Sequence, residues 1–389
     1  MTSRSGAPKI TVIIPTRERC DVFTSALRTV VAQDYDNLEI LVSDNFSTDD
    51  THEIVECIAD PRVRYLNTGK RLSMSGNWEF ALSHVTGDWV TIIGDDDGLL
   101  PDALNRASEF IREMDVLAFQ STICRYRWPG NKGRQYGRIR VPLTRGEEVR
   151  LSRTWMNRVL QGQVVYAELP MLYTGGFADM RVLADLKRRM GAFYNSCVPD
   201  VYSGFAIASL LPRYGFSRSP LAIAGISKHS IGVDHFRKQE KIETSPSQKF
   251  AAEENIPFHK DIPLMDDGGY PPSLQVTALE AYLQSAPLRN DHPAALFDQQ
   301  LEVILSATDA DDCNITSWAR KFAAMHDLDY EHARSKSRRR RLLRKFEELP
   351  VNFTRRIKRR TLGSPTQPLE NVYEASLAAD ALLRKKALR

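Results

Sequence analysis

The stretch that decides the predicted fold is GDWVTIIGDDD, from Gly87 to Asp97. An apolar, β-branched run typical of a buried strand passes directly into three acids, Asp95, Asp96 and Asp97. Three adjacent carboxylates repel one another, so a fold tolerates them only where solvent or a cation compensates their charge. Oxygen ligands of this kind suit Mg²⁺ or Mn²⁺, which take one or two carboxylates together with substrate phosphates. A solvated acidic turn is the alternative for the triplet taken alone.

The hundred residues around this stretch alternate between strand and helix signals. Strands are predicted at residues 10–14, 38–42, 63–66 and 89–93, and helices after Asp21, around 54–58 and over about 75–85. Strand and helix alternating at this spacing predict an α/β fold, with a mostly parallel sheet and helices on both faces.

The predicted strands end in polar residues. Pro15-Thr16-Arg17 follows the first strand, Ser43-Asp44-Asn45 the second, and the acidic triplet the fourth. Ligands of open parallel sheets bind beyond the carboxyl ends of the strands. We therefore expect these three ends to converge on one polar site.

These three motifs, in this order and spacing, resemble the family-two glycosyltransferases of the GT-A fold. The resemblance covers about residues 9–235 and rests on TVIIPTR from Thr11, LVSDNFSTD from Leu41 and the stretch ending at Asp97. It implies an inverting transfer of a hexosyl-type sugar from a nucleotide-diphosphate donor to an acceptor hydroxyl. It also implies a place in bacterial polysaccharide or glycolipid synthesis, with a saccharide or lipid-linked acceptor.

The resemblance assigns donor-binding roles to several residues. Pro15, Thr16 and Arg17 map to the strand end that contacts the nucleotide, and Asp44 maps to the acid that bonds the base. Arg71 and Asn77 lie where related enzymes touch the base or the sugar. A surface arginine and a helix N-terminal asparagine are the alternative interpretations of these last two residues.

The acidic triplet matches the D-x-D motif of the family. Asp97 is the expected direct ligand of a divalent cation, Mn²⁺ or Mg²⁺, and Asp95 or Asp96 is expected to make ribose or water-mediated contacts. The family often has an aliphatic-Asp-x-Asp-Asp pattern, and Gly94 stands here where its first Asp might fall. The register of the triplet is therefore open by one residue.

Inverting transfer needs a base within hydrogen-bond reach of the acceptor hydroxyl. The family places this base about a hundred residues after D-x-D at the start of a helix, and Asp200 in VPDVY matches it. The more familiar form of that motif is Glu-Asp, and Pro199 replaces its first acid. An N-cap role for Asp200 is the alternative, and the two roles can coexist.

Two further motifs match the family. The run YTGGF from Tyr173 corresponds to a region that binds acceptor or donor sugar, although its glycines also suit a simple turn. The run SKHSIG from Ser227 resembles a late motif whose histidine reaches the metal or diphosphate from a closing loop, which makes His229 a candidate metal contact. A structural histidine is the alternative.

The chain divides into a glycosyltransferase domain, a linker and a helical extension. The domain spans residues 1–235, with a nucleotide-binding half at about 9–115 and an acceptor half at about 116–235 that contains helices near 152–160, 180–190 and 201–211. Residues 236–272 are polar and proline-rich, as linkers are, and residues 273–389 are predicted to be helical.

The basic residues are concentrated in one segment. Residues 334–360 hold thirteen Lys or Arg and two acids, a net charge of +11 that leaves −7 for the remainder of the chain. Interleaved apolar residues suit binding to an anionic membrane surface, and a solvated or body-packed segment is the alternative. No nucleic-acid recognition module accompanies the charge, so nucleic acid is not an expected partner.

The remaining composition predicts a cytoplasmic protein that is at most peripheral on the inner face of the membrane. No apolar run of about 18 residues exists, and the five cysteines are scattered as reduced thiols are.

Two other functions compete with glycosyl transfer. A sugar nucleotidyltransferase would want a glycine-rich phosphate loop after the first strand, where this chain has Pro15-Thr16-Arg17-Glu18-Arg19. The other alternative is a non-catalytic module that binds sugar nucleotides.

Overall fold

The predicted alternation over the first hundred residues is confirmed in a computed structural model, which describes residues 6–130, 136–230, 253, 255–289, 296–307, 313–342, 359–363 and 366–387. The elements, in order, are β1 (Ile10–Thr16), α1 (Cys20–Val31), β2 (Leu38–Asp44), α2 (Thr51–Ile58), β3 (Val63–Asn67), α3 (Met74–Leu82) and β4 (Trp89–Ile92). β1 pairs in parallel with both β2 and β4, and β2 pairs in parallel with β3. This half of the sheet is the parallel one expected.

Beyond β4 the sheet becomes mixed. The further strands are β5 (Gly98–Leu99), β6 (Ala118–Arg127), β7 (Arg138–Pro142), β8 (Glu147–Leu151), β9 (Gly176–Asp179), β10 (Arg213–Ile226) and β11 (Arg359–Leu362). β9 lies between β4 and β6 and is antiparallel to both, while β6 and β7 form an antiparallel pair. β10 runs parallel to β6 but antiparallel to β5 and β8. The prediction of a mostly parallel sheet therefore holds for β1–β4, and the remainder of the sheet is mixed.

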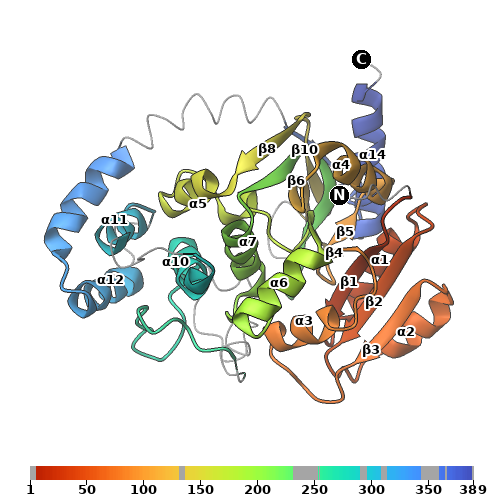
Figure 1. The fold of residues 1–389 in the computed structure, drawn as a ribbon. Helices are drawn as coiled ribbons and strands as arrows, with labels where there is room; N and C mark the ends of the chain where they lie inside the picture. Colours follow the sequence, from red (N-terminus) through yellow and green to blue (C-terminus); the bar gives the residue numbers. More distant parts are fainter. Residues whose placement is uncertain are drawn as a thin grey trace.

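Side chains alternate between the two faces of β1, as the pleat of a strand requires. Val12 and Ile14 pack with α1 and with α4 (Ala103–Met114) on one face. Ile13 packs on the other face with α3, α5 (Ser152–Leu160), α6 (Met180–Met190) and α7 (Pro199–Leu210). Helices thus cover both faces, as predicted (Figure 1).

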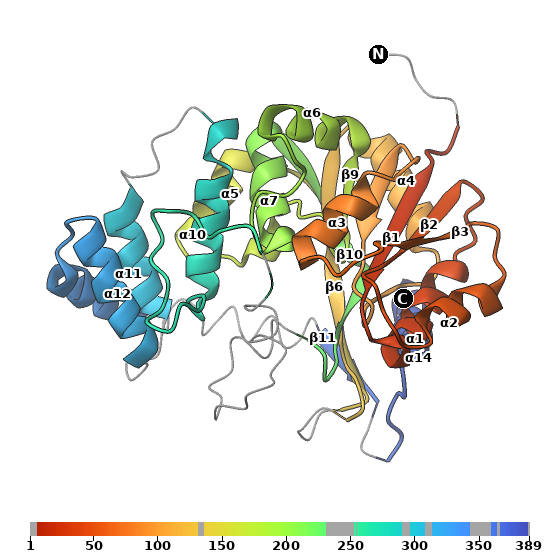
Figure 2. The same ribbon diagram turned by 90° about the horizontal axis from the view of Figure 1, so that it is seen from below.

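The helical extension lies against α7, far from β1–β3, in both views (Figures 1 and 2). It contains α10 (Leu274–Gln284), α11 (Phe297–Ala307), α12 (Cys313–Met325) and a helical run over 330–342. Tyr282 of α10 meets Phe205 of α7 edge-on, with ring centroids 6.0 Å apart. Of the predicted linker, residues 253 and 255–272 are described.

The last helix returns to the half of the molecule that contains β1–β4. α14 (Val372–Ala387) packs Val372, Ala375 and Ala379 against Val22 and Ala26 of α1 (Figure 1). The Tyr126 hydroxyl donates a hydrogen bond to the Leu369 carbonyl just before this helix. The C-terminal region thus contributes to two separate parts of the fold.

A buried acid joins the extension to the domain. Glu280 of α10 has no exposed surface, and its Oε2 accepts a hydrogen bond of 2.7 Å from the Ser196 hydroxyl. Burial raises the pKa of Glu280 from 4.5 to about 7, because desolvation penalises the charged form.

Glu280 makes stability depend on pH. Because its folded-state pKa lies above its ordinary value, the folded protein holds a proton that the unfolded chain releases between pH 4.5 and about 7. Its contribution to stability is therefore lost as pH rises through that window. We expect Glu280→Gln to raise the free energy of unfolding by roughly 1–3 kcal/mol at about pH 8, and by much less at about pH 4.

Urea denaturation at both pH values checks this, with Glu331→Gln as the control. The Glu331 side chain is 68% exposed, so its replacement should change little at either pH. An equal gain from Glu280→Gln at both pH values would contradict the expectation.

Candidate active site

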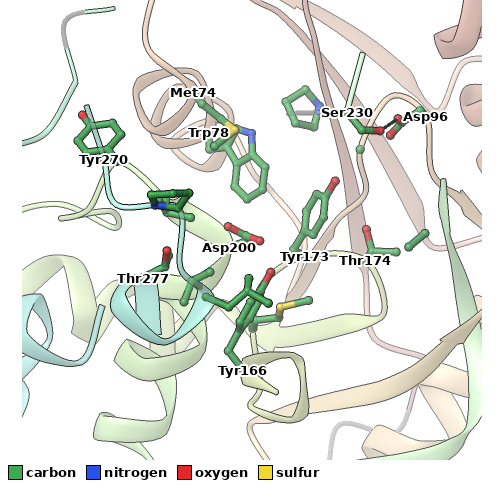
Figure 3. A pocket seen from close by; sticks show the side chains of 18 of the residues that line it. Met74, Trp78, Asp96, Tyr166, Tyr173, Thr174, Asp200, Ser230, Tyr270 and Thr277 are labelled. Atoms are coloured by element: carbon green, nitrogen blue, oxygen red, sulfur yellow. Dashed lines mark hydrogen bonds between the residues drawn. The ribbon is translucent and has the colours of Figure 1, made fainter. Parts of the chain in front are cut away.

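A cavity of about 890 Å³ opens where the strand ends meet. One wall, as expected, contains residues from the ends of three strands: Pro15, Thr16, Arg17, Asn45, Gly94, Asp95 and Asp96. The opposite wall comes from α7 and the extension, with Asp200, Tyr270 and Thr277 among the lining residues (Figure 3). The predicted convergence of the strand ends is confirmed.

The charge of Asp95 is compensated by residues from the N-terminal part of the chain. Its Oδ1 lies 3.0 Å from Arg19 Nη1, and its Oδ2 accepts a 3.1 Å hydrogen bond from the Thr16 hydroxyl. Burial raises its pKa, and the Arg19 guanidinium opposes that shift. Arg19 also donates to the His229 carbonyl at 2.9 Å, so it links β1 to the segment after β10.

Asp96 is held by the segment that follows β10. Its Oδ2 accepts hydrogen bonds from the hydroxyls of Ser227 and Ser230 at 2.6 and 2.8 Å. The pair formed with Ser230 is drawn in Figure 3. Asp96 also lines the cavity, so its carboxylate group borders the space in which a ligand would lie.

Asp97 points into the protein instead. Its Oδ2 accepts hydrogen bonds from the Thr174 hydroxyl and from Gly94 N, and its Oδ1 accepts one of 2.7 Å from Gly225 N. Burial, with the neighbouring charge of Asp96, raises its pKa to about 7. Asp97 does not line the cavity, which favours Asp96 as the acid that faces a ligand.

Two glycines are required by the packing around the triplet. A Cβ at Gly225 would lie 1.8 Å from the Asp96 carbonyl oxygen, and one at Gly94 would lie 2.5 Å from the Tyr173 hydroxyl. The space beside Gly94, where the family often has an acid, is therefore taken by Tyr173. Burial raises the pKa of Tyr173 well above its usual value, and the charges of Asp97 and Asp96 add to the shift.

Asp200 lies inside the same cavity, at the start of α7. It is the second residue of the helix, whose N-cap is Val198, so the alternative N-cap role does not apply. Burial raises its pKa from 3.8 to about 6, and hydrogen bonding from the backbone opposes the shift. In Figure 3 its carboxylate lies between Asp96 on one side and Tyr270 and Thr277 on the other.

Of the other residues predicted to contact the donor, Asn77 lines the cavity, and Asp44 and Arg71 do not. Asn77 lines the cavity and exchanges hydrogen bonds with Ser43. Asp44 is buried outside the cavity wall and accepts a 2.5 Å hydrogen bond from the Tyr65 hydroxyl, which raises the pKa of Tyr65, together with burial, to about 12. Arg71 is 59% exposed and does not line the cavity.

His229 faces away from the triplet. Its Nε2 lies 3.1 Å from Asp21 Oδ1 on α1, and the residue is absent from the cavity wall, whereas the neighbouring Ser230 is present. The structure thus brings the SKHS motif to the site through its serines.

A divalent cation fits the acids on the cavity wall. Among the residues that the structure describes, no group of three or more His, Cys, Asp or Glu side chains could hold a metal by itself. Asp95 and Asp96 nevertheless present carboxylate oxygens to one cavity, with Arg19 as a cationic partner of Asp95. Such a site suits a hard cation that takes its other ligands from water and phosphate.

Several lining residues were not predicted as part of the site. Arg19 had a signal, since it follows Arg17 at a strand end that faces an acidic triplet. No local pattern marks the others, which are Tyr166, Phe258, Met265, Asp266, Asp267 and Tyr270. Over the described part of the chain, no helix has both the length and the hydrophobicity to cross a bilayer.

Comparison with known proteins finds that part of the chain is similar to sugar transferases. The glycosyl transferase family 2 model matches residues 11–177. Over 101 residues the chain is 39% identical to the GalNAc(5)-diNAcBac-PP-undecaprenol beta-1,3-glucosyltransferase of Campylobacter jejuni, a match that covers 25% of this chain and 33% of that protein. It is 28% identical over 102 residues to the succinoglycan biosynthesis protein ExoO of Rhizobium meliloti, covering 26% and 29%. The matches thus span about a third of these relatives.

Solved structures show a distant likeness. S. aureus TarS 1–349 in complex with UDP-GlcNAc has a TM-score of 0.49 at 15% identity, covering 86% of this chain and 92% of that one. The mannosyltransferase PcManGT of Pyrobaculum calidifontis, in complex with GDP-Man and Mn²⁺, has a TM-score of 0.42 at 18% identity, covering 87% and 88%. At these values neither likeness bears on activity.

The family match covers all three strand-end motifs and extends to Phe177 at the strand that joins the two parts of the sheet. The expected α/β fold of the GT-A type is confirmed by this match together with the observed sheet. Residues 11–177 of this chain match the model of glycosyl transferase family 2.

Proposed function

We propose that the protein is an inverting glycosyltransferase that moves a sugar from a nucleotide-diphosphate donor to an acceptor hydroxyl. The observation that carries this proposal is the placement of Asp96 and Asp200 on one cavity, whose nucleotide-side wall is built from strand ends of a family 2 domain. A donor placed along that wall would present its anomeric carbon toward Asp200.

The donor binds along the ends of β1, β2 and β4 in this proposal. Thr16, Asn45 and Asn77 offer hydrogen-bonding groups at the cavity wall. Arg17 also lines it and pairs there with Glu253 at 2.5 Å. A diphosphate would compete with Glu253 for this guanidinium, since Arg pairs well with phosphate.

We assign the direct metal contact to Asp96, with Asp95 beside it, in place of Asp97. Both oxygens of Asp97 are already bonded to Thr174, Gly94 and Gly225. A bound Mn²⁺ or Mg²⁺ would neutralise charge on the leaving diphosphate. Asp97 instead holds the loop in shape, and Ser227 and Ser230 orient Asp96.

Asp200 acts as the general base. The acceptor oxygen forms a bond to the anomeric carbon, the bond from that carbon to the diphosphate breaks, and the acceptor proton passes to the Asp200 carboxylate. Burial of Asp200 raises its proton affinity while leaving it ionised near neutral pH. Attack from the face opposite the leaving group inverts the anomeric centre.

The acceptor class follows from the relatives. Their names include a PP-undecaprenol glucosyltransferase and a succinoglycan biosynthesis protein, so we propose a saccharide or lipid-linked acceptor in bacterial polysaccharide or glycolipid synthesis. Such an acceptor suits a cytoplasmic enzyme that is peripheral on the inner face of the membrane.

The basic segment is the candidate membrane contact, and part of it packs on the body. Lys336 pairs with Glu302 at 3.0 Å, while Arg340 and Arg341 donate to carbonyls of Gln161 and Leu305. Residues 343–358 lie outside the described part of the chain, and Arg359 and Arg360 belong to β11.

Replacing the base tests the proposal most directly. We expect Asp200→Asn to lower kcat by about 10²–10⁴-fold, because an amide cannot accept the acceptor proton, while the melting temperature stays close to that of the wild type. Release of nucleoside diphosphate from a panel of UDP- and GDP-sugars measures turnover. The control is Asp185→Asn on the outer face of α6, which should keep wild-type turnover.

Failure of the whole panel with the wild type would favour a non-catalytic module. Release of pyrophosphate from a sugar phosphate and a nucleoside triphosphate would identify a nucleotidyltransferase. Near-normal turnover by Asp200→Asn would remove Asp200 from the base role.

The pH profile gives an independent check on Asp200. Its pKa of about 6 predicts that kcat/KM rises with pH through about 6 and then levels, since the ionised form is the active one. The residual activity of Asp200→Asn should not show this rise of kcat/KM with pH. A wild-type profile that is flat between about pH 5 and 7 would contradict the assignment.

Metal removal separates the roles of Asp96 and Asp97. We expect EDTA to lower wild-type turnover at least about tenfold and Mn²⁺ or Mg²⁺ to restore it. Asp96→Asn should remove the response to added metal with little change in melting temperature. Asp97→Asn should lower the melting temperature, because it weakens bonds from Thr174 and two backbone amides. Metal response that survives Asp96→Asn would refute the assignment.

A further inference from the structure

The loop that precedes α10, residues 255–272, forms part of one wall of the cavity. The cavity is lined beyond residue 255 by Phe258, Met265, Asp266, Asp267, Tyr270 and Thr277, among others. All of them lie outside residues 11–177, the part of the chain that the family model matches. This wall therefore comes from a part of the chain that the family match does not cover.

The loop is anchored to the helices of the extension. Trp318 Nε1 of α12 donates to the Pro263 carbonyl at 2.6 Å, and His326 Nε2 lies 2.8 Å from the Asp261 carbonyl. Gln284 of α10 donates to the Pro257 carbonyl at 3.0 Å. These contacts hold the loop at both its first and its central part.

The extension is also tied to the segment that carries Asp200. The Ser196 hydroxyl donates to Glu280 of α10, and the Ser196 carbonyl accepts from the Ser75 hydroxyl at 2.7 Å. Ser196 precedes Asp200 by four residues. The helices of the extension thus contact both the loop and the segment that carries the proposed base.

The side chains of the loop have the chemistry of a saccharide site. The rings of Phe258 and Tyr270 stack with centroids 4.7 Å apart, and both residues line the cavity. Aromatic rings pack against the apolar C–H face of a sugar, while carboxylates accept hydrogen bonds from its hydroxyls. Asp266 and Asp267 are exposed on the same loop and supply such carboxylates.

The position of the loop suits an acceptor rather than a donor. Tyr270 and Thr277 lie on the side of Asp200 opposite Asp96 (Figure 3). A base that takes the acceptor proton must lie between the donor and the acceptor, and Asp200 does so if the acceptor is held by this loop.

We propose that the lining residues Phe258, Asp266, Asp267, Tyr270 and Thr277 form the acceptor subsite. The acceptor group bound there is a sugar ring, which packs on Phe258 and Tyr270 and bonds to Asp266 and Asp267. This proposal rests on the proposed function, because it assigns the second substrate of the same site. It extends the acceptor region beyond residue 235 and into the extension.

The test measures both substrates separately. Tyr270→Leu removes the aromatic face but keeps apolar volume, and Asp267→Ala removes an exposed carboxylate with little risk to folding. Initial rates are measured with p-nitrophenyl hexosides and N-acetylhexosaminides as acceptors and UDP- or GDP-sugars as donors. We expect the KM for acceptor to rise about tenfold or more in Tyr270→Leu and at least about threefold in Asp267→Ala, while the donor KM stays within about twofold.

Lys260→Ala is the matched control, since Lys260 lies on the same loop, is exposed and is not part of the cavity wall. It should leave both KM values unchanged. An unchanged acceptor KM in both test variants, or a donor KM that rises instead, would overturn the proposal.

Saturation-transfer NMR with methyl glycosides gives a readout that needs no turnover. We expect a signal with the wild type and with Lys260→Ala, and its loss in Tyr270→Leu; melting curves confirm that each variant is folded. No signal from any methyl glycoside on the wild type would also overturn the proposal. If the wild type cleaves no donor yet binds glycosides through Tyr270, the proposed transfer fails while the saccharide site stands.

Discussion

Three consecutive carboxylates after β4 must be kept apart and compensated, and much of the site is arranged around this constraint. Each acid has partners from a different part of the chain: Asp95 from β1 and Arg19, Asp96 from Ser227 and Ser230, and Asp97 from Thr174, Gly94 and Gly225. Hydrogen bonds to a charged group are worth roughly 1.5–3 kcal/mol each, so these contacts offset part of the cost of burying the acids. They also bring the segment after β10 and the YTGGF motif onto the loop after β4.

This arrangement gives the acids different roles. Asp97 is bonded on both oxygens and does not line the cavity, which suits a structural role, whereas Asp96 lines the cavity and is oriented by two serines. The asymmetry depends on Gly225, because a side chain there would collide with the Asp96 carbonyl. The second functional group, Asp200, depends on α7, which packs between the sheet and α10. The position of the proposed base therefore depends on the domain and on the extension together.

Much of the fold could be predicted because its signals are local. The apolar run of residues 10–14 and the periodic apolar residues after Asp21 predict a buried strand and a half-buried helix from the local sequence alone. β9 and β10 gave weaker signals: β9 has four residues, and β10 contains Pro220 and shifts register between Ser217 and Ala222. Both are stabilised by pairing with strands distant in sequence, which no local pattern contains. That pairing is why the sheet turns antiparallel after β4.

The candidate site divides in the same way. The sequence by itself determined that acids follow a buried strand, that Asp200 begins a helix, and that polar strand ends meet, because these depend on residue type and on the geometry of parallel sheets. Only the tertiary structure decided which acids of the triplet face the cavity, where the His229 ring points, and that Phe258 and Tyr270 line the same cavity as Asp200. Those outcomes depend on side-chain direction and on contacts between segments tens to hundreds of residues apart. Neither can be predicted from the local sequence.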